Sequence, residues 1–214
     1  MKESYDAIAD TYGAQFTKAD DPIRLGYLRQ LFEHLRASEK DVANVLELGC
    51  GAGIPATKFT LQNDKPLINV TGNDLSTTQL NLARSNLTGY EKRLTLLDGD
   101  MLSLSFPDAT FDAVTGFYSI IHLPRGEQTQ LMSKIVGWLK PDGYFLANFG
   151  ANEMSGLEAD RWLDQEKGWM YWSGWGEEAS LKMVEEAGLK VLTKDLHQDE
   201  GDAKFVWVLA RKAT

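Results

Sequence analysis

The stretch Val45-Leu46-Glu47-Leu48-Gly49-Cys50-Gly51-Ala52-Gly53 decides the fold of this 214-residue chain. Its apolar residues predict a buried β-strand, and its alternating glycines predict a tight turn that a ligand can approach closely, because glycine has no Cβ. A second apolar run, from Leu67 to Gly72, leads to Asp74, which follows Gly53 by 21 residues. The spacing predicts a strand, a glycine turn, a helix and a second parallel strand that ends in a carboxylate.

A carboxylate about 20 residues beyond a glycine turn is placed to accept hydrogen bonds from a ribose, so the pattern indicates a nucleoside cofactor. A dinucleotide-binding turn has the spacing G-x-G-x-x-G and binds a pyrophosphate. Here the third glycine comes one residue earlier, and Glu47 lies two residues before the first. A carboxylate at that position repels a pyrophosphate and attracts an α-amino group and a sulfonium. The pattern favours S-adenosylmethionine; the alternative is a structural turn in another parallel α/β protein.

The motifs between residues 40 and 150 resemble those of the class I S-adenosylmethionine-dependent methyltransferases, particularly the small-molecule group called type 11. The matching segments are Glu47–Gly53, Gly72–Ser76, Asp98–Met101, Phe111–Val114 and Leu139–Tyr144, the last as the turn before the fifth strand. One departure is Asn73, where the family often carries an apolar residue.

The resemblance implies S-adenosyl-L-methionine as cofactor and a Rossmann-like α/β fold. That fold is a doubly wound, mostly parallel, seven-stranded sheet with the last strand antiparallel. The resemblance also places the ribose on Asp74 and the adenine on Asp100. The cofactor-binding residues that it implies are Tyr12, Glu47, Gly49, Cys50, Gly51, Gly53, Asp74, Leu75, Asp100, Met101 and Phe117.

Periodicity predicts the remaining elements. It indicates two N-terminal helices, and Ser76 with Gln79 forms a capping-box pattern for a helix after the second strand. Further strands are predicted at residues 94–97, 112–116, 144–148, 191–196 and 205–210, and helices at 131–139 and 177–187. Because strands alternate with helices, we expect a parallel sheet covered on both faces, with ligands at the carboxyl ends of the strands. The predicted single domain, residues 1–214, comprises an N-terminal helical cap (1–40), a cofactor-binding core (41–150), an aromatic insertion after the fifth strand (150–176), and the last helix and strands (177–214).

The aromatic insertion holds four of the six tryptophans of the chain. So long a connection is usually functional or disordered, and aromatic side chains favour order because they supply apolar burial. Two alternatives are open, an extra helix packed on the sheet and a lid that covers the substrate. On the lid hypothesis, the acceptor-binding residues are Tyr118, His122, Asn148, Trp169, Tyr171 and Trp172.

His122 follows the fourth predicted strand and is the candidate catalytic residue. As a general base, it would accept a proton from the acceptor. The alternative is a histidine that packs or caps a helix. Cys50, inside the glycine turn, is interpreted as a small filling residue and not as a nucleophile.

Composition limits the partners. A net charge of −9 without a long basic stretch disfavours nucleic acid as a substrate. A single cysteine excludes a disulfide framework, and the sequence shows no tight cluster of metal ligands and no secretory or transmembrane apolar segment. We therefore expect a cytoplasmic monomer or homodimer with a small-molecule acceptor, and no metal, nucleic acid or membrane partner.

Three functions compete. The leading one is in-line methyl transfer to an O, N or S atom of a small metabolite, in which positioning of the nucleophile can contribute roughly 7–11 kcal/mol. The second is a protein or peptide methyltransferase with an open acidic groove that attracts basic tails. The third is a non-catalytic cofactor-binding module. A dehydrogenase is disfavoured because no Tyr-x-x-x-Lys sequence occurs in the chain.

Overall fold

The computed structural model describes residues 2–16, 20–198 and 203–213, with only the backbone of residue 10 and of residues 12–16. The described chain divides into two compact units. Unit 1 comprises residues 1–104 and 159–170, and unit 2 comprises residues 105–158 and 171–214. Among the described residues, no helix has the length and apolar character needed to cross a membrane.

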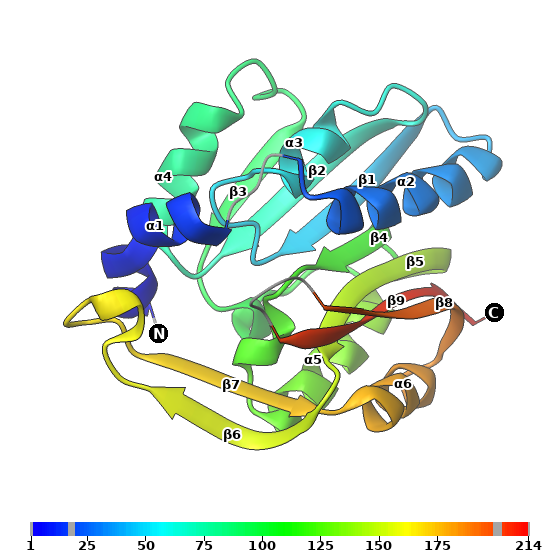
Figure 1. Cartoon of the computed structure of the whole chain (residues 1–214). Coiled ribbons are helices and arrows are strands. Elements are labelled where there is room, and N and C mark those ends of the chain that lie inside the picture. Colours follow the sequence, from blue (N-terminus) through cyan, green and yellow to red (C-terminus); the bar gives the residue numbers. More distant parts are fainter. Residues whose placement is uncertain (1, 17–19, 199–202, 214) are drawn as a thin grey trace. The chain divides into compact units, whose positions relative to one another are not determined.

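Unit 1 contains the two predicted N-terminal helices and the first parallel strands (Figure 1). β1 pairs with β2 in parallel and β2 pairs with β3 in parallel, so that Asp74 lies beside Asp98 at the ends of their strands. The polar residues that follow these strands therefore share one edge. The elements are α1 (Lys2–Phe16), α2 (Pro22–Ala37), β1 (Val42–Leu48), α3 (Ala56–Leu61), β2 (Leu67–Asp74), α4 (Thr77–Asn86), β3 (Leu94–Asp98) and the 3₁₀ turns η1 (Met101–Ser103) and η3 (Trp162–Asp164).

Unit 2 contains the later strands and their helices. Its core includes Phe145, Phe149 and Trp207, whose side chains are fully buried. The elements are β4 (Phe111–Gly116), the 3₁₀ turn η2 (Ile120–His122), α5 (Arg125–Trp138), β5 (Leu139–Gly150), most of β6 (Glu153–Ala159) and of β7 (Met170–Trp175), α6 (Glu177–Glu186), β8 (Leu189–Gln198) and β9 (Lys204–Lys212).

In the described residues, the strands form a seven-stranded sheet with the order β3-β2-β1-β4-β5-β9-β8. β4 and β5 are parallel, whereas β9 runs antiparallel to both β5 and β8. This confirms the predicted mostly parallel, Rossmann-like fold with an antiparallel last strand.

The fifth strand begins earlier than the sequence predicts. Leu139 already pairs with Phe111, and the next pair is Tyr144 with Ala113. The predicted turn between these pairs is an irregularity inside β5, with Asp142 at a φ of +62°. A tight excursion of this kind interrupts the ladder without ending the strand.

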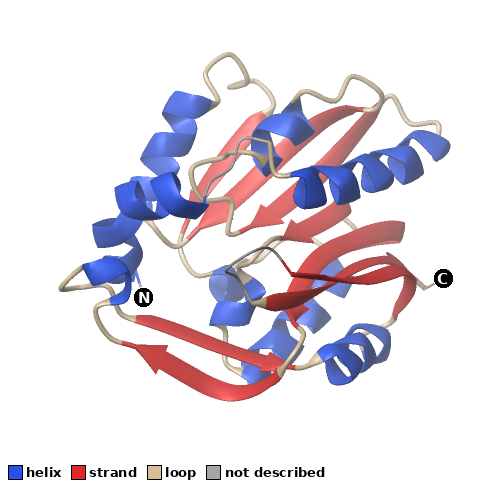
Figure 2. Cartoon of the chain, viewed as in Figure 1, coloured by secondary structure: helices blue, strands red, loops and turns tan. Residues whose placement is uncertain are grey.

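The aromatic insertion forms a ribbon in which β6 pairs with β7, separate from the main sheet (Figure 2). The alternative of an extra packed helix is therefore wrong. The reason lies in β7, whose sequence Met170-Tyr171-Trp172-Ser173-Gly174-Trp175 is rich in aromatic residues that favour strands. The function of the ribbon as a substrate lid stays a prediction.

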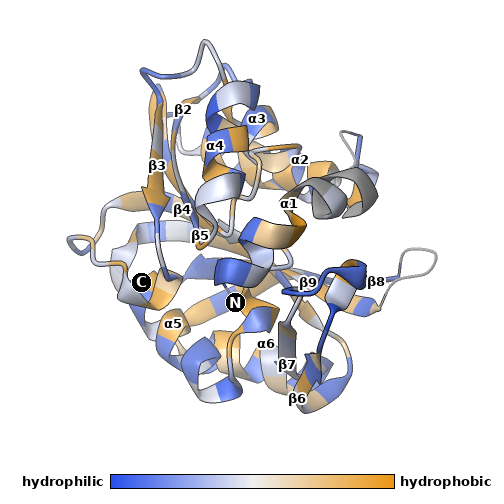
Figure 3. Cartoon of the chain, turned by 90° about the vertical axis from the view of Figure 1, so that its left-hand side faces the viewer, coloured by the Kyte–Doolittle hydropathy of each residue, from blue (hydrophilic) through white to orange (hydrophobic). Residues whose placement is uncertain are grey.

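The helices bury one face, as α2 illustrates. Its residues Leu25, Leu28, Leu31, Phe32 and Leu35 are buried and recur at intervals of three and four. This is the spacing of an apolar stripe, and each fully buried side chain of this type contributes about 1.5–3 kcal/mol. The helices accordingly carry both hydrophobic and hydrophilic residues (Figure 3).

The start of α4 confirms the cap predicted at Ser76. The Ser76 Oγ accepts a hydrogen bond from the Gln79 N–H at 3.1 Å. The Ser76 N–H, which the capping-box pattern assigns to the Gln79 side chain, donates instead to Asp74 Oδ1 at 2.9 Å. The helix cap is thus tied directly to the carboxylate that ends β2.

Candidate functional site

The glycine turn follows β1 in unit 1. Gly49, Gly51 and Gly53 have φ angles of +71°, +54° and +77°, a region that residues with a Cβ rarely adopt. The N–H groups of Gly49 and Cys50 both donate to the Asn73 carbonyl, at 2.8 and 2.9 Å. The turn is therefore held against the end of β2 by backbone hydrogen bonds.

Cys50 fills the space behind this turn. Its side chain is buried, and a Cβ on Gly72 would lie only 3.0 Å from its Sγ. Burial raises the pKa of the Cys50 thiol well above its usual value, and the negative charges of Asp74 and Glu47 raise it further. Because a protonated thiol is a poor nucleophile, the structure supports a packing role for Cys50.

Asp74 uses both carboxylate oxygens to hold the surrounding backbone. Oδ2 accepts from the Gly51 N–H at 2.8 Å, and Oδ1 accepts from the Ser76 N–H at 2.9 Å. Burial raises the pKa of Asp74, while these two hydrogen bonds act in the opposite direction. Each carboxylate oxygen can accept more than one hydrogen bond, so the ribose hydroxyls of a cofactor can still bind here.

Glu47 is a buried carboxylate near the end of β1. Its side chain is only 4% exposed, and its Oε2 accepts from the Thr57 hydroxyl at 2.7 Å. Burial raises the pKa of Glu47 to about 7, although the Thr57 hydrogen bond and the charge of Arg24 lower it. Because a buried carboxylate is costly to ionise without a cation, the position suits a ligand with an ammonium group.

The segment after β3 is fastened by two polar side chains. The Asp100 Oδ1 accepts from the Leu102 N–H at 2.9 Å and caps η1. Asn73 is 1% exposed, and its Nδ2 donates to the carbonyls of Leu97, at 3.1 Å, and Gly99, at 2.8 Å. The residue that departs from the family pattern therefore joins the end of β3 to the end of β2.

His122 lies in unit 2, at the end of η2. Its Nδ1 is 2.8 Å from the Tyr171 carbonyl oxygen, and since a carbonyl only accepts, Nδ1 carries the hydrogen. The His122 ring also lies 6.0 Å from the Trp172 ring. Desolvation lowers the pKa of His122 to about 4, against the effect of hydrogen bonds with the backbone of Tyr171 and Tyr118. The imidazole is therefore neutral near pH 7, as a general base must be.

Tyr118 and Asn148 lie together in unit 2. The Asn148 Oδ1 accepts from the Tyr118 N–H at 2.7 Å, which identifies the other amide atom as the nitrogen. Within the described part of the chain, this buried Nδ2 has no hydrogen-bond partner. The Tyr118 ring packs edge-on against Phe205 and Trp207, with centroids 4.9 and 5.8 Å apart. A buried donor without a partner is costly, so the Asn148 amide suits a ligand atom that accepts a hydrogen bond.

These motifs and contacts agree with a known family. A family model described as "Methyltransferase domain" matches residues 45–143, which include Glu47, the glycine turn, Asp74 and Asp100. The chain carries a class I, S-adenosylmethionine-dependent methyltransferase domain. The family resemblance of the motifs is thus confirmed.

Relatives of this methyltransferase domain include enzymes with different acceptors. The sterol 24-C-methyltransferase of Yarrowia lipolytica is 27% identical over 172 residues, covering 78% of this chain and 44% of that protein. The fatty-acid O-methyltransferase of Mycolicibacterium smegmatis is 34% identical over 138 residues, covering 63% of this chain and 46% of that protein. The chain thus spans less than half the length of these two relatives.

Solved structures share the fold of the methyltransferase domain. The 1,6-didemethyltoxoflavin-N1-methyltransferase of Burkholderia thailandensis, with its substrate and S-adenosylhomocysteine bound, has a TM-score of 0.65 and 17% identity, covering 100% of this chain and 91% of that chain. The N-methyltransferase NodS of Bradyrhizobium japonicum has a TM-score of 0.61 and 17% identity, covering 91% of this chain and 99% of that chain.

The structure places most of the predicted cofactor residues of the methyltransferase domain in unit 1. Phe117 is the exception, because it is buried in unit 2 with its ring 5.7 Å from the Trp207 ring. The side chain of Tyr12 lies outside the described residues. Those found in unit 1, at the ends of β1 and β2, in the glycine turn or in the segments after β2 and β3, are Glu47, Gly49, Cys50, Gly51, Gly53, Asp74, Leu75, Asp100 and Met101.

The predicted acceptor residues of the methyltransferase domain fall into both units. Unit 2 brings His122 together with Tyr171 and Trp172, and Tyr118 together with Asn148. Trp169 directly precedes β7 and lies in unit 1. In the described ranges, no group of three His, Cys, Asp or Glu side chains is arranged to hold a metal ion.

Several residues that act on the site carry no signal in the sequence that identifies them. Thr57 donates to Glu47, Arg24 lowers the pKa of the Glu47 carboxyl, and Lys2 and Asp6 contact the loop after β2. A buried acid on a predicted strand does signal that a donor must be near, since buried polar groups are hydrogen-bonded. It does not identify the donor, because that depends on which helix packs over the strand.

Proposed function

We propose that the chain is an enzyme that transfers the methyl group of S-adenosyl-L-methionine to an O, N or S atom of a small molecule. The observation that carries the proposal is the combination in unit 1 of a buried carboxylate, a glycine turn and an acid fixed beside it. Glu47, with its pKa raised to about 7, suits an ammonium group, and Asp74 suits a pair of hydroxyls. A pyrophosphate would instead meet the charge of Glu47.

Each unit 1 residue has a distinct role in holding the cofactor. Glu47 binds the α-amino group, Asp74 binds the ribose hydroxyls, and Asp100 accepts a hydrogen bond from the adenine amino group. When bound, the cofactor supplies an electrophilic methyl group on a sulfonium. The protein therefore has to orient the acceptor and exclude water. Positioning of this kind can lower the free-energy barrier of the reaction by roughly 7–11 kcal/mol.

We assign the acceptor to the unit 2 cluster around His122. The neutral His122 imidazole takes the proton of an O–H, N–H or S–H acceptor, while its Nδ1 stays hydrogen-bonded to the Tyr171 carbonyl. The Asn148 Nδ2 donates a hydrogen bond to an acceptor oxygen or nitrogen.

Trp172 is the aromatic residue of the ribbon that best suits the acceptor. Successive residues of a strand point to opposite faces, so Tyr171 and Trp172 present their rings to different sides. The Trp172 ring lies near His122, whereas the Tyr171 hydroxyl donates across the ribbon to the Ser155 carbonyl at 3.4 Å. A contact between Trp169 and the acceptor stays a prediction.

The names of the relatives support a small acceptor and do not select its atom. They cover methyl transfer to carbon in sterols and to oxygen in fatty acids, and one structural neighbour is named as an N1-methyltransferase. For this chain we favour an O, N or S atom because a neutral histidine is useful only if the acceptor carries a proton that must be removed.

A labelling screen tests the proposal. The purified protein is incubated with methyl-labelled S-adenosylmethionine and fractions of small metabolites, with basic peptides as a second panel, and labelled products are identified by mass. We expect label in a small molecule. Label in peptides alone supports the alternative of a peptide methyltransferase. Binding of S-adenosylhomocysteine without any transfer supports a non-catalytic module.

The cytoplasmic location and the monomeric or homodimeric state stay predictions.

A further inference from the structure

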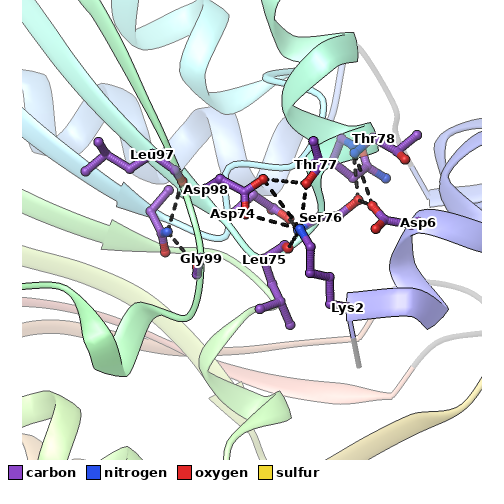
Figure 4. Close-up of polar contacts among 12 residues, drawn as sticks. Lys2, Asp6, Asp74, Leu75, Ser76, Thr77, Thr78, Leu97, Asp98 and Gly99 are labelled. Carbon is purple, nitrogen blue, oxygen red and sulfur yellow. Dashed lines mark hydrogen bonds and ion pairs between the residues drawn. The ribbon is translucent and has the colours of Figure 1, made fainter.

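Asp6, on the first turns of α1, contacts the loop between β2 and α4 (Figure 4). Its Oδ1 accepts from the Ser76 hydroxyl at 2.6 Å and from the Thr78 N–H at 3.1 Å. These partners lie 70 and 72 residues away in the sequence. Burial opposes the ionisation of Asp6, but the hydrogen bonds from Ser76 and Thr78 lower its pKa below the usual range. Asp6 is therefore an ionised acceptor that holds the start of α4.

Lys2, one helical turn earlier, contacts the same segment (Figure 4). Its Nζ donates to the Leu75 carbonyl at 2.8 Å and to the Thr77 Oγ1 at 2.6 Å. It also forms an ion pair with Asp98, at 3.1 Å, and Asp98 in turn accepts from the Thr77 hydroxyl. Lys2 thus connects the loop after β2 with the end of β3.

The two contacts converge on the proposed ribose ligand. The Ser76 hydroxyl donates to Asp6, and the Ser76 N–H donates to Asp74. The charges act on the same carboxylate, since Lys2 lowers the pKa of Asp74 and Asp6 raises it. The geometry and the charge of Asp74 are therefore both set in part by α1.

Capping of α4 does not by itself require Asp6. The helix has its own cap, because the Ser76 Oγ accepts from the Gln79 N–H. Asp6 adds an acceptor for the Ser76 hydroxyl hydrogen and so fixes the orientation of the cap. The helix can form without this hydrogen bond between Ser76 and Asp6. A preorganised ligand site, in contrast, requires that the residues beside the ligand be held in place.

We propose that Lys2 and Asp6 are positioning residues for the cofactor. They hold the segment Leu75–Thr78, which comprises the loop after β2 and the first two residues of α4, and thereby orient Asp74 toward the ribose, so that docking of α1 and binding of the cofactor favour one another. By linkage, docking of α1 strengthens cofactor binding by the same factor by which the cofactor strengthens docking of α1. This inference rests on the proposed function, because it takes Asp74 as a ligand of the cofactor.

Calorimetric titration with S-adenosylhomocysteine tests the proposal in the full chain. Asp6→Ala removes both hydrogen bonds and should weaken binding by about tenfold. Asp6→Asn keeps an acceptor oxygen at the same place and should restore most of the affinity. Lys2→Met should weaken binding several-fold in low salt and less in high salt, because its ion pair with Asp98 is partly exposed to screening ions. Glu3→Ala, an exposed acid on the same helix, is the control and should bind normally.

Two further measurements separate positioning from plain stabilisation. A merely structural contact lowers the Tm of the unliganded protein and leaves the affinity of the folded protein unchanged. Hydrogen exchange should show that the ligand protects the amides of residues 76–80 in the wild type, and protects them much less in Asp6→Ala. If Asp6→Ala does not fold, the affinities and exchange rates of Asp6→Asn and Lys2→Met are compared with those of the wild type instead.

Wild-type affinity in both Asp6→Ala and Lys2→Met overturns the inference and leaves the proposed function standing. An equal loss of affinity in Glu3→Ala also overturns the inference, because the loss would then follow from the net charge of α1 and not from the contacts of Lys2 and Asp6. If the wild-type protein does not bind S-adenosylhomocysteine at all, the proposed function itself is refuted, and this inference falls with it.

Discussion

The Nδ1 of His122 donates to the carbonyl oxygen of Tyr171 at 2.8 Å, which joins the turn after β4 to β7 of the aromatic ribbon. Because a carbonyl oxygen only accepts, the bond selects the neutral tautomer with its hydrogen on Nδ1. One contact therefore both anchors the ribbon and sets the chemical state of the proposed base.

Two side chains of α5 extend this pattern along β7. Gln128 donates to the Ser173 carbonyl at 3.2 Å, and Arg125 donates to the Gly174 carbonyl at 3.0 Å. Together with His122, they donate hydrogen bonds to three carbonyls of β7, a strand that is not part of the main sheet. Since unpaired carbonyls are costly when buried, these side chains supply what a neighbouring strand would otherwise supply.

His122→Asn should separate the two roles of the histidine. The asparagine amide can donate from near the position of Nδ1 and lacks an equivalent of Nε2. We expect a protein of near-wild-type stability whose kcat falls by about 10²–10⁴-fold, the usual contribution of a general base. Steady-state kinetics and urea denaturation measure the two effects. Undiminished kcat in this variant would leave His122 with a structural role only.

The stability of the protein should depend on pH through His122. Its pKa in the folded state is about 4, below the usual value of 6.5, so the unfolded chain binds a proton that the folded chain does not. The contribution is fully present above pH 6.5 and is lost as the pH falls toward 4, with an upper size of roughly 3 kcal/mol. Relative to His122→Asn, the wild type should therefore lose free energy of unfolding as the pH falls from 7.5 to 5, as measured by urea denaturation. A constant difference would contradict the depressed pKa.

Glu47→Gln should stabilise the unliganded protein above neutral pH. The folded-state pKa of Glu47 is about 7, above the usual 4.5, so the wild type loses stability as the pH rises from 4.5 through 7. The amide removes that loss, by roughly 3 kcal/mol at most, and the two proteins should converge near pH 4.5. Denaturation curves at pH 5 and 8 provide the test. The same variant should bind S-adenosylhomocysteine more weakly, and a variant that binds as tightly as the wild type would show that the ammonium lies elsewhere.

Asp74→Ala should weaken the binding of S-adenosylhomocysteine by at least about tenfold, because it leaves ligand hydroxyls and the Gly51 and Ser76 N–H groups without their acceptor. Asp74→Asn, which keeps one acceptor oxygen, should fall between Asp74→Ala and the wild type. Asp64→Asn, an exposed acid elsewhere in unit 1, is the matched control. Calorimetry that shows equal affinities for all of them would mean that another acid binds the ribose.

Arg125→Met should loosen the ribbon while preserving much of the apolar contact with Trp175. The guanidinium lies 5.0 Å from the Trp175 ring and donates to the carbonyls of Met154 and Gly174. Leaving these carbonyls unpaired costs about 1–3 kcal/mol each where they are buried. Hydrogen exchange should show faster exchange in residues 153–158 and 171–175 and little change in α2. Unchanged exchange in the ribbon would show that it is held by packing alone.

Much of the fold was predictable because its signals are local. The strand, glycine turn and acid around Glu47 and Asp74 appear at their predicted positions, and α6 (Glu177–Glu186) lies within the helix predicted at residues 177–187. The aromatic ribbon was not predictable in the same way. Aromatic residues favour strands but can also form the buried face of a packed helix, and the sequence of residues 150–176 lacks the periodicity that separates the two.

The sequence by itself determined the elements whose causes lie within a few residues. Among these are the turn that only glycine can form, the helix cap at Ser76, and the acid at the end of β2. The tertiary structure alone decided that Lys2 meets Asp98, 96 residues away, and that His122 meets Tyr171, 49 residues away. The physical reason is that hydrogen bonds between distant segments depend on which faces pack together, and local periodicity specifies a face without specifying its partner.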